Sequence, residues 1–182
     1  AVLDDEQWLQ WRHIILSLNA NIEMTAFFTC DKAHFPIVIF EFNHHPMTDT
    51  DFETFLNTWE GLYRHDVPFK LVFNTTNMAI PNPKYCIKMA MFIKKIRTFN
   101  PQHLQVSYVS VQNSTISNLL ECMFYMQPPV APVHITLEQN TSTIVHYLQS
   151  IDKESAHNED GAGFQSTITK VILPSKPFLL FL

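Results

Sequence analysis

The sequence predicts an α/β fold with a mostly parallel central sheet of about five strands and flanking helices. Three observations predict it. Apolar residues alternate along the chain between the spacing of strands and the spacing of helices. Polar capping residues or prolines stand at the expected helix starts. The segment 35–42 reads FPIVIFEF, a nearly continuous apolar run typical of a strand that is buried on both faces of a sheet.

The first predicted element is an amphipathic helix within residues 1–20. Its apolar residues Trp8, Trp11, Ile15 and Leu18 follow one another at steps of three, four and three. Such a stripe has to pack against a domain or a partner. Two strands are expected after it, over residues 22–30 and 35–42.

The next helix is predicted to begin at Thr48. A carboxylate follows three residues later at Asp51, and Met47 and Phe52 are placed for a hydrophobic staple across the helix start. The buried stripe of this helix comprises Phe52, Phe55, Leu56, Trp59 and Leu62.

Two further strand–helix units are expected. The strand 69–73 precedes a helix that has Asn82 as its cap and Pro83 at its first position, and that runs to about Arg97. The strand 104–111 precedes a helix that Ser114 can cap and that ends before Pro128. Strands alternating with helices in this way favour a mostly parallel sheet.

The last predicted unit joins a short strand, 133–135, to a helix that begins with a capping box over residues 136–139. After Ile151 the chain becomes polar, contains two of the three glycines and reads as a flexible linker. The end of the chain is apolar again and either returns to the sheet as a strand or docks elsewhere. We therefore divide the chain into 1–20 (helix), 21–152 (α/β domain), 153–166 (linker) and 167–182 (apolar tail).

Composition excludes several classes of function. Three glycines in 182 residues make neither a Rossmann turn nor a P-loop. A net charge of −5 does not favour binding to nucleic acid, whose phosphates attract basic surfaces. No apolar run reaches the length of an integral membrane segment. The cysteines Cys30, Cys86 and Cys122 are odd in number and far apart, which favours the cytoplasm or another reducing compartment over a disulfide framework.

Four segments carry a resemblance to a known superfamily: FPIVIFEFNHHPMTDTDFETFL (35–56), FKLVFNTT (69–76), NSTISNLLECMFYMQPPVAPVHITL (113–137) and TLEQNTSTIVHYL (136–148). In their order, spacing and character they resemble small uncharacterised bacterial STAS-like and CRAL-TRIO-like proteins, over about two thirds of the chain. The resemblance implies a STAS-like fold and a protein that is not an enzyme. It implies a protein-interaction module, a regulatory switch or a carrier of hydrophobic ligands.

In the switch members of that superfamily, a serine at the start of the helix after the third strand is phosphorylated. The matching region here is 74–78, which lacks the Asp-Ser-Ser-type sequence. Thr75, Thr76 and Asn77 are therefore candidate binding residues, with ordinary turn residues as the alternative interpretation.

The rest of the sequence contains no strong metal-binding or catalytic motif. Adjacent His44 and His45 would point to opposite faces of a strand, and Asp49 and Asp51 serve a helix start, so no metal site is predicted. No nucleophile elbow is present. We expect no catalytic residue and no cofactor.

Two groups of residues leave alternatives open. The helix near residue 90 carries five basic residues, which could meet an acidic partner or a lipid headgroup but more often form a solvated face. Met89, Met91, Met123 and Met126 serve either as core filler or as an adaptable interface.

Low charge and apolar chain ends favour a non-enzymatic protein-interaction module, a regulatory or structural subunit of a larger assembly that binds a protein partner or a second copy of itself. Its docking arms would carry Trp8, Trp11, Phe178, Leu179 and Phe181. The alternative function is binding or transfer of a hydrophobic ligand or lipid, with the chain ends closing over a cavity.

Overall fold

A seven-stranded sheet forms the centre of the molecule, and its strands lie in the same order as in the chain. The computed structural model describes residues 22–25, 27–153 and 164–174. β3 to β6 are parallel, whereas β1, β2 and β7 each pair in antiparallel fashion with their neighbour. The strands are β1 (Ile22–Met24), β2 (Phe28–Asp31), β3 (Ile37–Phe42), β4 (Phe69–Asn74), β5 (Leu104–Ser110), β6 (Val133–Thr136) and β7 (Ile168–Ile172). The predicted α/β class and mostly parallel sheet are confirmed.

The sheet has more strands than the five predicted, for two reasons. The segment 22–30 is an antiparallel hairpin rather than one strand, because Thr25 makes a tight turn in its middle. The Thr25 hydroxyl oxygen accepts hydrogen bonds from the backbone N–H groups of Phe27 and Phe28 at 3.2 and 3.1 Å. In addition, residues 168–172 return to the sheet as β7, which is one of the two outcomes expected for the apolar tail.

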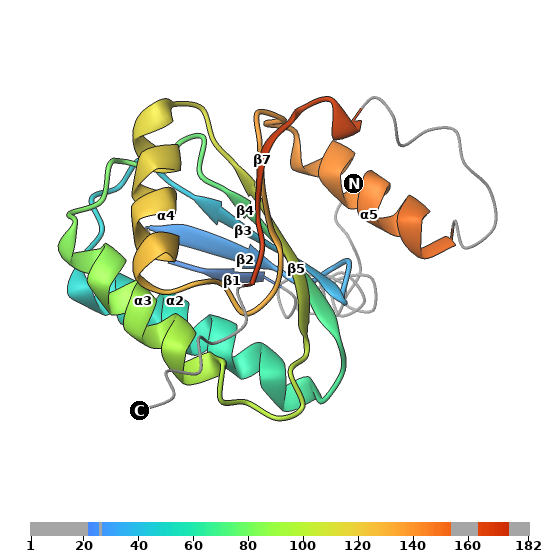
Figure 1. Cartoon of the computed structure of the whole chain (residues 1–182), viewed down its shortest axis with the longest axis horizontal. Helices are drawn as coiled ribbons and strands as arrows, with labels where there is room; N and C mark the ends of the chain where they lie inside the picture. The colour runs from blue at the N-terminus through green and yellow to red at the C-terminus, as the bar shows by residue number, and fades with distance from the viewer. Residues whose placement is uncertain (1–21, 26, 154–163, 175–182) are drawn as a thin grey trace, which may run out of the picture.

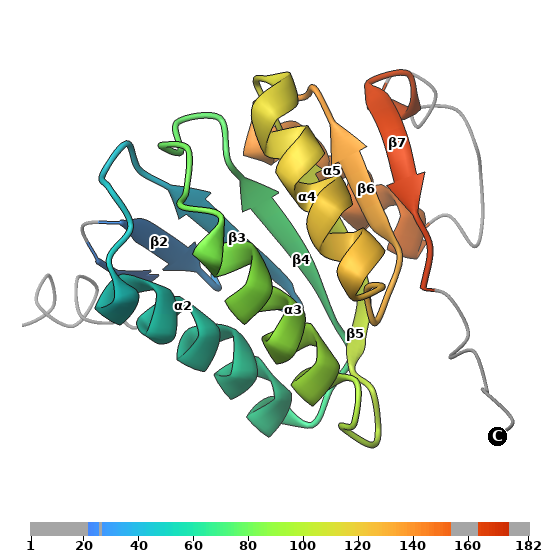
Figure 2. The ribbon, with the colours of Figure 1, turned by 60° about the vertical axis from the view of Figure 1, so that its left-hand side comes forward.

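Three helices cover one face of the sheet and one helix covers the other (Figures 1 and 2). α2 (Asp49–Leu62), α3 (Lys84–Ile96) and α4 (Ser114–Met126) lie side by side on the first face, and α5 (Thr141–Lys153) lies on the second. A short 3₁₀ helix, η1 (Tyr63–His65), follows α2. Because parallel crossovers share one hand, strands added successively in one direction bring their helices to the same face.

The helix starts follow the predicted residues closely in α2 and less closely in the later helices. Thr48 and Asp51 form a complete capping box in α2. α4 is capped by Asn113 rather than Ser114: its side chain accepts a hydrogen bond from the N–H of Ile116. The predicted box at 136–139 is wrong, because Thr136 ends β6 and α5 begins at Thr141.

Two apolar cores lie on the two sides of the sheet, and the strands supply both. In β3, Val38, Phe40 and Phe42 face α2, α3 and α4, whereas Ile37 and Ile39 belong to the core beneath α5. This alternation is the two-residue period of a strand with both faces buried. None of the helices in the described part of the chain has the length and apolar content needed to cross a membrane.

Candidate functional site

An apolar cavity of about 150 Å³ lies between the sheet and the three helices α2, α3 and α4. Its floor is formed by side chains of β3, β4 and β5, among them Phe42, Phe73 and Val109. Its walls come from the inner faces of the three helices. For comparison, an engineered cavity of about 150 Å³ in another protein, lined by aliphatic and aromatic side chains, stays dry and binds benzene. The space is therefore large enough for one aromatic ring.

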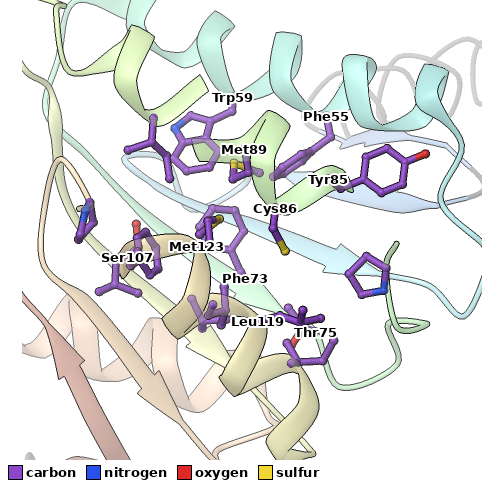
Figure 3. A pocket seen from close by; sticks show the side chains of 18 of the residues that line it. Phe55, Trp59, Phe73, Thr75, Tyr85, Cys86, Met89, Ser107, Leu119 and Met123 are labelled. Atoms are coloured by element: carbon purple, nitrogen blue, oxygen red, sulfur yellow. The ribbon is translucent and has the colours of Figure 1, made fainter. Parts of the chain in front are cut away.

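Aromatic side chains form the part of the wall nearest α2. Figure 3 shows Trp59, Phe55 and Tyr85 along one side of the cavity, with Phe73 of the sheet close to Trp59. The rings hold one another in place: the centroids of Trp59 and Phe73 are 5.2 Å apart, and those of Phe55 and Trp59 are 6.0 Å apart. Edge and tilted contacts of this kind add to the burial energy of the rings, so this wall is preorganised.

The wall nearest α3 and α4 is softer. Met89 of α3 and Met123 of α4 line it, together with Leu119 and Cys86 (Figure 3). Leu119, Met89 and Cys86 are only partly buried, so this part of the lining reaches the surface. Methionine is flexible and fills irregular space, which lets this wall adjust to a ligand.

The cavity carries no charge at neutral pH. Aspartate, glutamate, lysine and arginine are absent from its lining. The Tyr85 hydroxyl donates a hydrogen bond to the carbonyl oxygen of Met47 at 3.2 Å. Burial raises the pKa of the Cys86 thiol, which therefore stays protonated. An apolar or uncharged ligand is the only kind that such a lining accepts without a desolvation penalty.

The loop after β4, which contains the predicted binding residues, lies at one end of the cavity. The Thr75 hydroxyl donates to the carbonyl oxygen of Ser110 at 2.7 Å, and the residue lines the cavity. The Thr76 hydroxyl donates to the Asn74 side-chain oxygen at 2.6 Å. Both hydroxyl donors thus stabilise the turn, which agrees with the turn-residue interpretation, and Asn77 is exposed beside them.

A second, polar hollow lies on the outer side of the same loop, at the carboxyl ends of the parallel strands. Residues that follow β3, β4 and β5 line it: His44, Thr76, Asn77, Met78, Ala79, Ile80, Gln112 and Asn113. In open α/β sheets this edge is the usual place for ligands, because the loops after several strands converge there. The sequence pointed to Thr76 and Asn77 but not to their neighbours from the other strands.

Basic residues of α3 and of its C-terminal end make contacts with other parts of the chain. Lys84 and Lys88 both reach Asp49 at the start of α2, and the hydrogen bonds from their ammonium groups lower the pKa of Asp49 to about 2. Lys95 pairs with Glu60 at 2.6 Å. Arg97 donates to the carbonyl oxygens of Pro128 and Pro129. Three of these four cations join α3 to α2, so they help to fix the cavity wall.

The other residues that the sequence singled out do not come together in one site within the described part of the chain. Among the described residues, no group of three or more histidine, cysteine or carboxylate side chains is placed to hold a metal ion. Cys30 is buried, Cys86 is partly buried and Cys122 is exposed, and all three are free thiols. The proposed docking arms, with Trp8, Trp11, Phe178, Leu179 and Phe181, lie outside the described residues.

Sequence reasoning missed the cavity, although it identified most of its lining as buried helix stripes. The signal that was available is the excess of bulky aromatic and methionine residues on the helices that face one side of the sheet. Four of the seven methionines line the cavity: Met47, Met78, Met89 and Met123.

Comparison of the chain with protein-family models, with curated proteins and with solved structures found no match.

Proposed function

We propose that this chain is a non-enzymatic binding module and that its principal site is the apolar cavity, which takes a small hydrophobic ligand. The uncharged lining of that cavity carries the proposal. A mostly apolar pocket with very few polar groups is the usual form of a site for a small apolar molecule. We therefore propose hydrophobic-ligand binding ahead of protein interaction.

The size of the cavity sets the class of ligand. A free space of about 150 Å³ suits a single aromatic ring or a short alkyl group. A long acyl chain exceeds this space and would have to extend out of the cavity. The first ligands to test are therefore small aromatic compounds rather than phospholipids.

The methionines supply a direct test. In protein labelled with ¹³C at the methionine methyl groups, titration with toluene is expected to shift the signals of Met89 and Met123 saturably. The signals of Met91 and Met126, which are exposed, should stay in place. No shift up to the solubility of toluene, or equal shifts at all methionines, would contradict the proposal.

A pair of matched variants tests whether toluene binds in this cavity. Leu119→Phe places a ring in the cavity and should weaken toluene binding about tenfold or more, since the ligand loses most of its space. Leu137→Phe makes the same change at an exposed leucine outside the cavity and should leave binding unchanged. Thermal unfolding of both variants checks that each one folds.

A second function, contact with a second copy of this chain, is favoured by a separate observation. Large apolar side chains are exposed on the outer side of the neighbouring helices α3 and α4: Ile87, Met91, Tyr125 and Met126. Tyr125 is 91% exposed and Met91 is 67% exposed. Exposed apolar side chains on neighbouring helices supply apolar surface of the kind that protein–protein contacts bury. A subunit of a larger assembly would use the same surface.

Light scattering across a range of protein concentrations tests this second function. A dimer is expected to form as the concentration rises, and Met91→Lys should shift it to monomer. Leu137→Lys, at an exposed leucine on another part of the molecule, is the control. A chain that stays monomeric at all concentrations would contradict self-association.

The STAS-like and CRAL-TRIO-like resemblance is part of the same proposal. Its support is the succession of strand–helix units from β3 to β6, in which each strand lies beside the preceding one. Members of that superfamily that carry hydrophobic ligands or bind proteins fit either function.

A further inference from the structure

The apolar cavity and the polar hollow meet at one short loop. Thr75 lines the cavity, Thr76 and Asn77 line the hollow, and Met78 lines both. The loop is held in place by the bonds from Thr75 to β5 and by the Asn74–Thr76 turn. Met78 is the residue that borders both spaces, and its flexible side chain is the part of the loop that would have to move for one molecule to occupy both.

The polar hollow offers uncharged hydrogen-bonding groups. The side-chain amides of Asn77 and Gln112 form no hydrogen bond within the described part of the chain, so their donors and acceptors are available to a ligand. Each amide carries both a carbonyl acceptor and an N–H₂ donor. A hydroxyl or amide group on a ligand can satisfy both kinds of partner.

Charged groups are disfavoured in the hollow. No lysine, arginine, aspartate or glutamate lines it. The nearby start of α4 is already capped, because the side-chain oxygen of Asn113 accepts the N–H of Ile116 at 3.1 Å. Lys84 and Lys88 are engaged by Asp49. Apart from His44, the hollow holds no titratable side chain, so neither an anion nor a cation would find a permanent opposite charge there to offset its loss of water.

We propose that the cavity and the hollow form one site for a small uncharged amphiphile, with a body of one aromatic ring or a short alkyl group and a head that carries a hydroxyl or amide. This inference rests on the proposed binding function of the cavity and adds the head group that the ligand carries.

Four probes that share one ring test the head group: toluene, benzyl alcohol, benzoate and benzylamine. Benzyl alcohol should bind about threefold to tenfold more tightly than toluene, as expected for a net gain of one neutral hydrogen bond. Benzoate and benzylamine should bind more weakly than toluene. Methyl signals of Met89 and Met123 report the ring, and the side-chain amide signals of Asn77 and Gln112 report the head.

The variant Asn77→Leu removes one amide from the hollow while leaving the cavity intact. It should abolish the advantage of benzyl alcohol over toluene and leave toluene affinity unchanged. Asn118→Leu, at an exposed asparagine of α4 that lines neither the cavity nor the hollow, should preserve that advantage.

The outcomes separate the two proposals. If toluene binds in the cavity but benzyl alcohol binds no better, the proposal that the cavity and the hollow form one joined site is wrong, and the proposal of a hydrophobic cavity site stands. The same conclusion follows if benzyl alcohol keeps its advantage over toluene in Asn77→Leu. If charged probes bind as well as benzyl alcohol, the joined site is likewise wrong. If none of the four probes shifts Met89 or Met123, both proposals fail.

Discussion

His134 lies on the face of the sheet that α5 covers, and its environment makes it sensitive to pH. Its ring stacks on Tyr108 with centroids 4.6 Å apart, and its buried Nδ1 atom has no hydrogen-bond partner among the described residues. Burial lowers the pKa of His134 below its usual value of 6.5. The pKa of Tyr108 is raised to about 12 by burial, so this neighbour stays neutral over the same range.

The folded protein is expected to lose stability as the pH falls from 7 to about 5. In that window the unfolded chain binds a proton at residue 134 more readily than the folded chain does, so acid favours unfolding. The variant His134→Phe keeps a ring on Tyr108 and removes the titration. Its free energy of unfolding, measured with urea, should therefore depend less on pH than that of the unchanged protein.

The exposed histidine of α5 provides the control. His146→Gln should keep the pH dependence of the unchanged protein. The loss assigned to His134 is a fraction of the about 1.4 kcal/mol per pH unit of one fully coupled proton, because the ring is partly solvated. Identical pH profiles for His134→Phe and the unchanged protein would contradict this role.

At the scale of elements, the start of α2 is the one helix start in the described part of the chain that has a complete capping box. The Thr48 hydroxyl oxygen accepts the N–H of Asp51 at 3.1 Å, and the Asp51 carboxylate accepts the N–H of Thr48 at 3.1 Å. α2 also carries Trp59 and Phe55, which form the rigid wall of the cavity. A local cap thus helps to position part of the binding site.

Thr48→Ala should destabilise the protein by about 1 kcal/mol, because the substitution leaves a backbone donor at the helix start without its partner. Denaturant unfolding measures the change. Thr54→Ala removes a hydroxyl that bonds only the carbonyl oxygen of Thr50 in the same helix, and it should be neutral or slightly stabilising. Equal losses in the two variants would show that the capping box contributes nothing specific.

Elements with a strong local signal were predictable, and elements whose local signal is weak or competes with a distant contact were not. The α2 cap needs only Thr48 and Asp51, so the sequence identifies it. The hairpin turn at Thr25 has no glycine or proline to mark it, and α5 begins at Thr141 because Asn140 accepts the N–H of Ser142 at 3.0 Å. The predicted box at Thr136 failed because its hydroxyl contacts Thr167, 31 residues later.

The candidate site was predictable only in part for the same reason. Thr75, Thr76 and Asn77 follow a strand directly, and their position in the sequence is enough to place them at the carboxyl edge of the sheet. The cavity arises where side chains of three helices and three strands meet. Sequence patterns show that these side chains are buried but do not show that they leave a space between them.

At the scale of the whole molecule, the two sides of the sheet are unequal. The core beneath α2, α3 and α4 contains most of the buried aromatic rings, whereas the core beneath α5 is smaller. Phe164 completes the smaller core by packing on Tyr147 with ring centroids 4.5 Å apart. Since local stability follows the number of buried apolar contacts, α5 should open more easily than the parallel strands.

Native-state hydrogen exchange tests this inequality. Backbone amides of α5 are expected to exchange through a local opening, at a lower free energy than amides of β3, β4 and β5, which should exchange only on global unfolding. The variant Phe164→Leu should speed exchange in α5 while leaving the central strands unchanged. Uniform exchange energies across α5 and the strands would contradict the prediction.

Because the order of strands in the sheet is their order in the chain, the sheet can grow in the direction of synthesis. Each strand from β2 onward pairs with a strand that leaves the ribosome before it, and none has to wait for a later one to enter between two neighbours. The cavity is complete once α4 and β6 have been made, since its lining ends at Val133. A ligand could therefore bind to the nascent chain before α5 and β7 are synthesised.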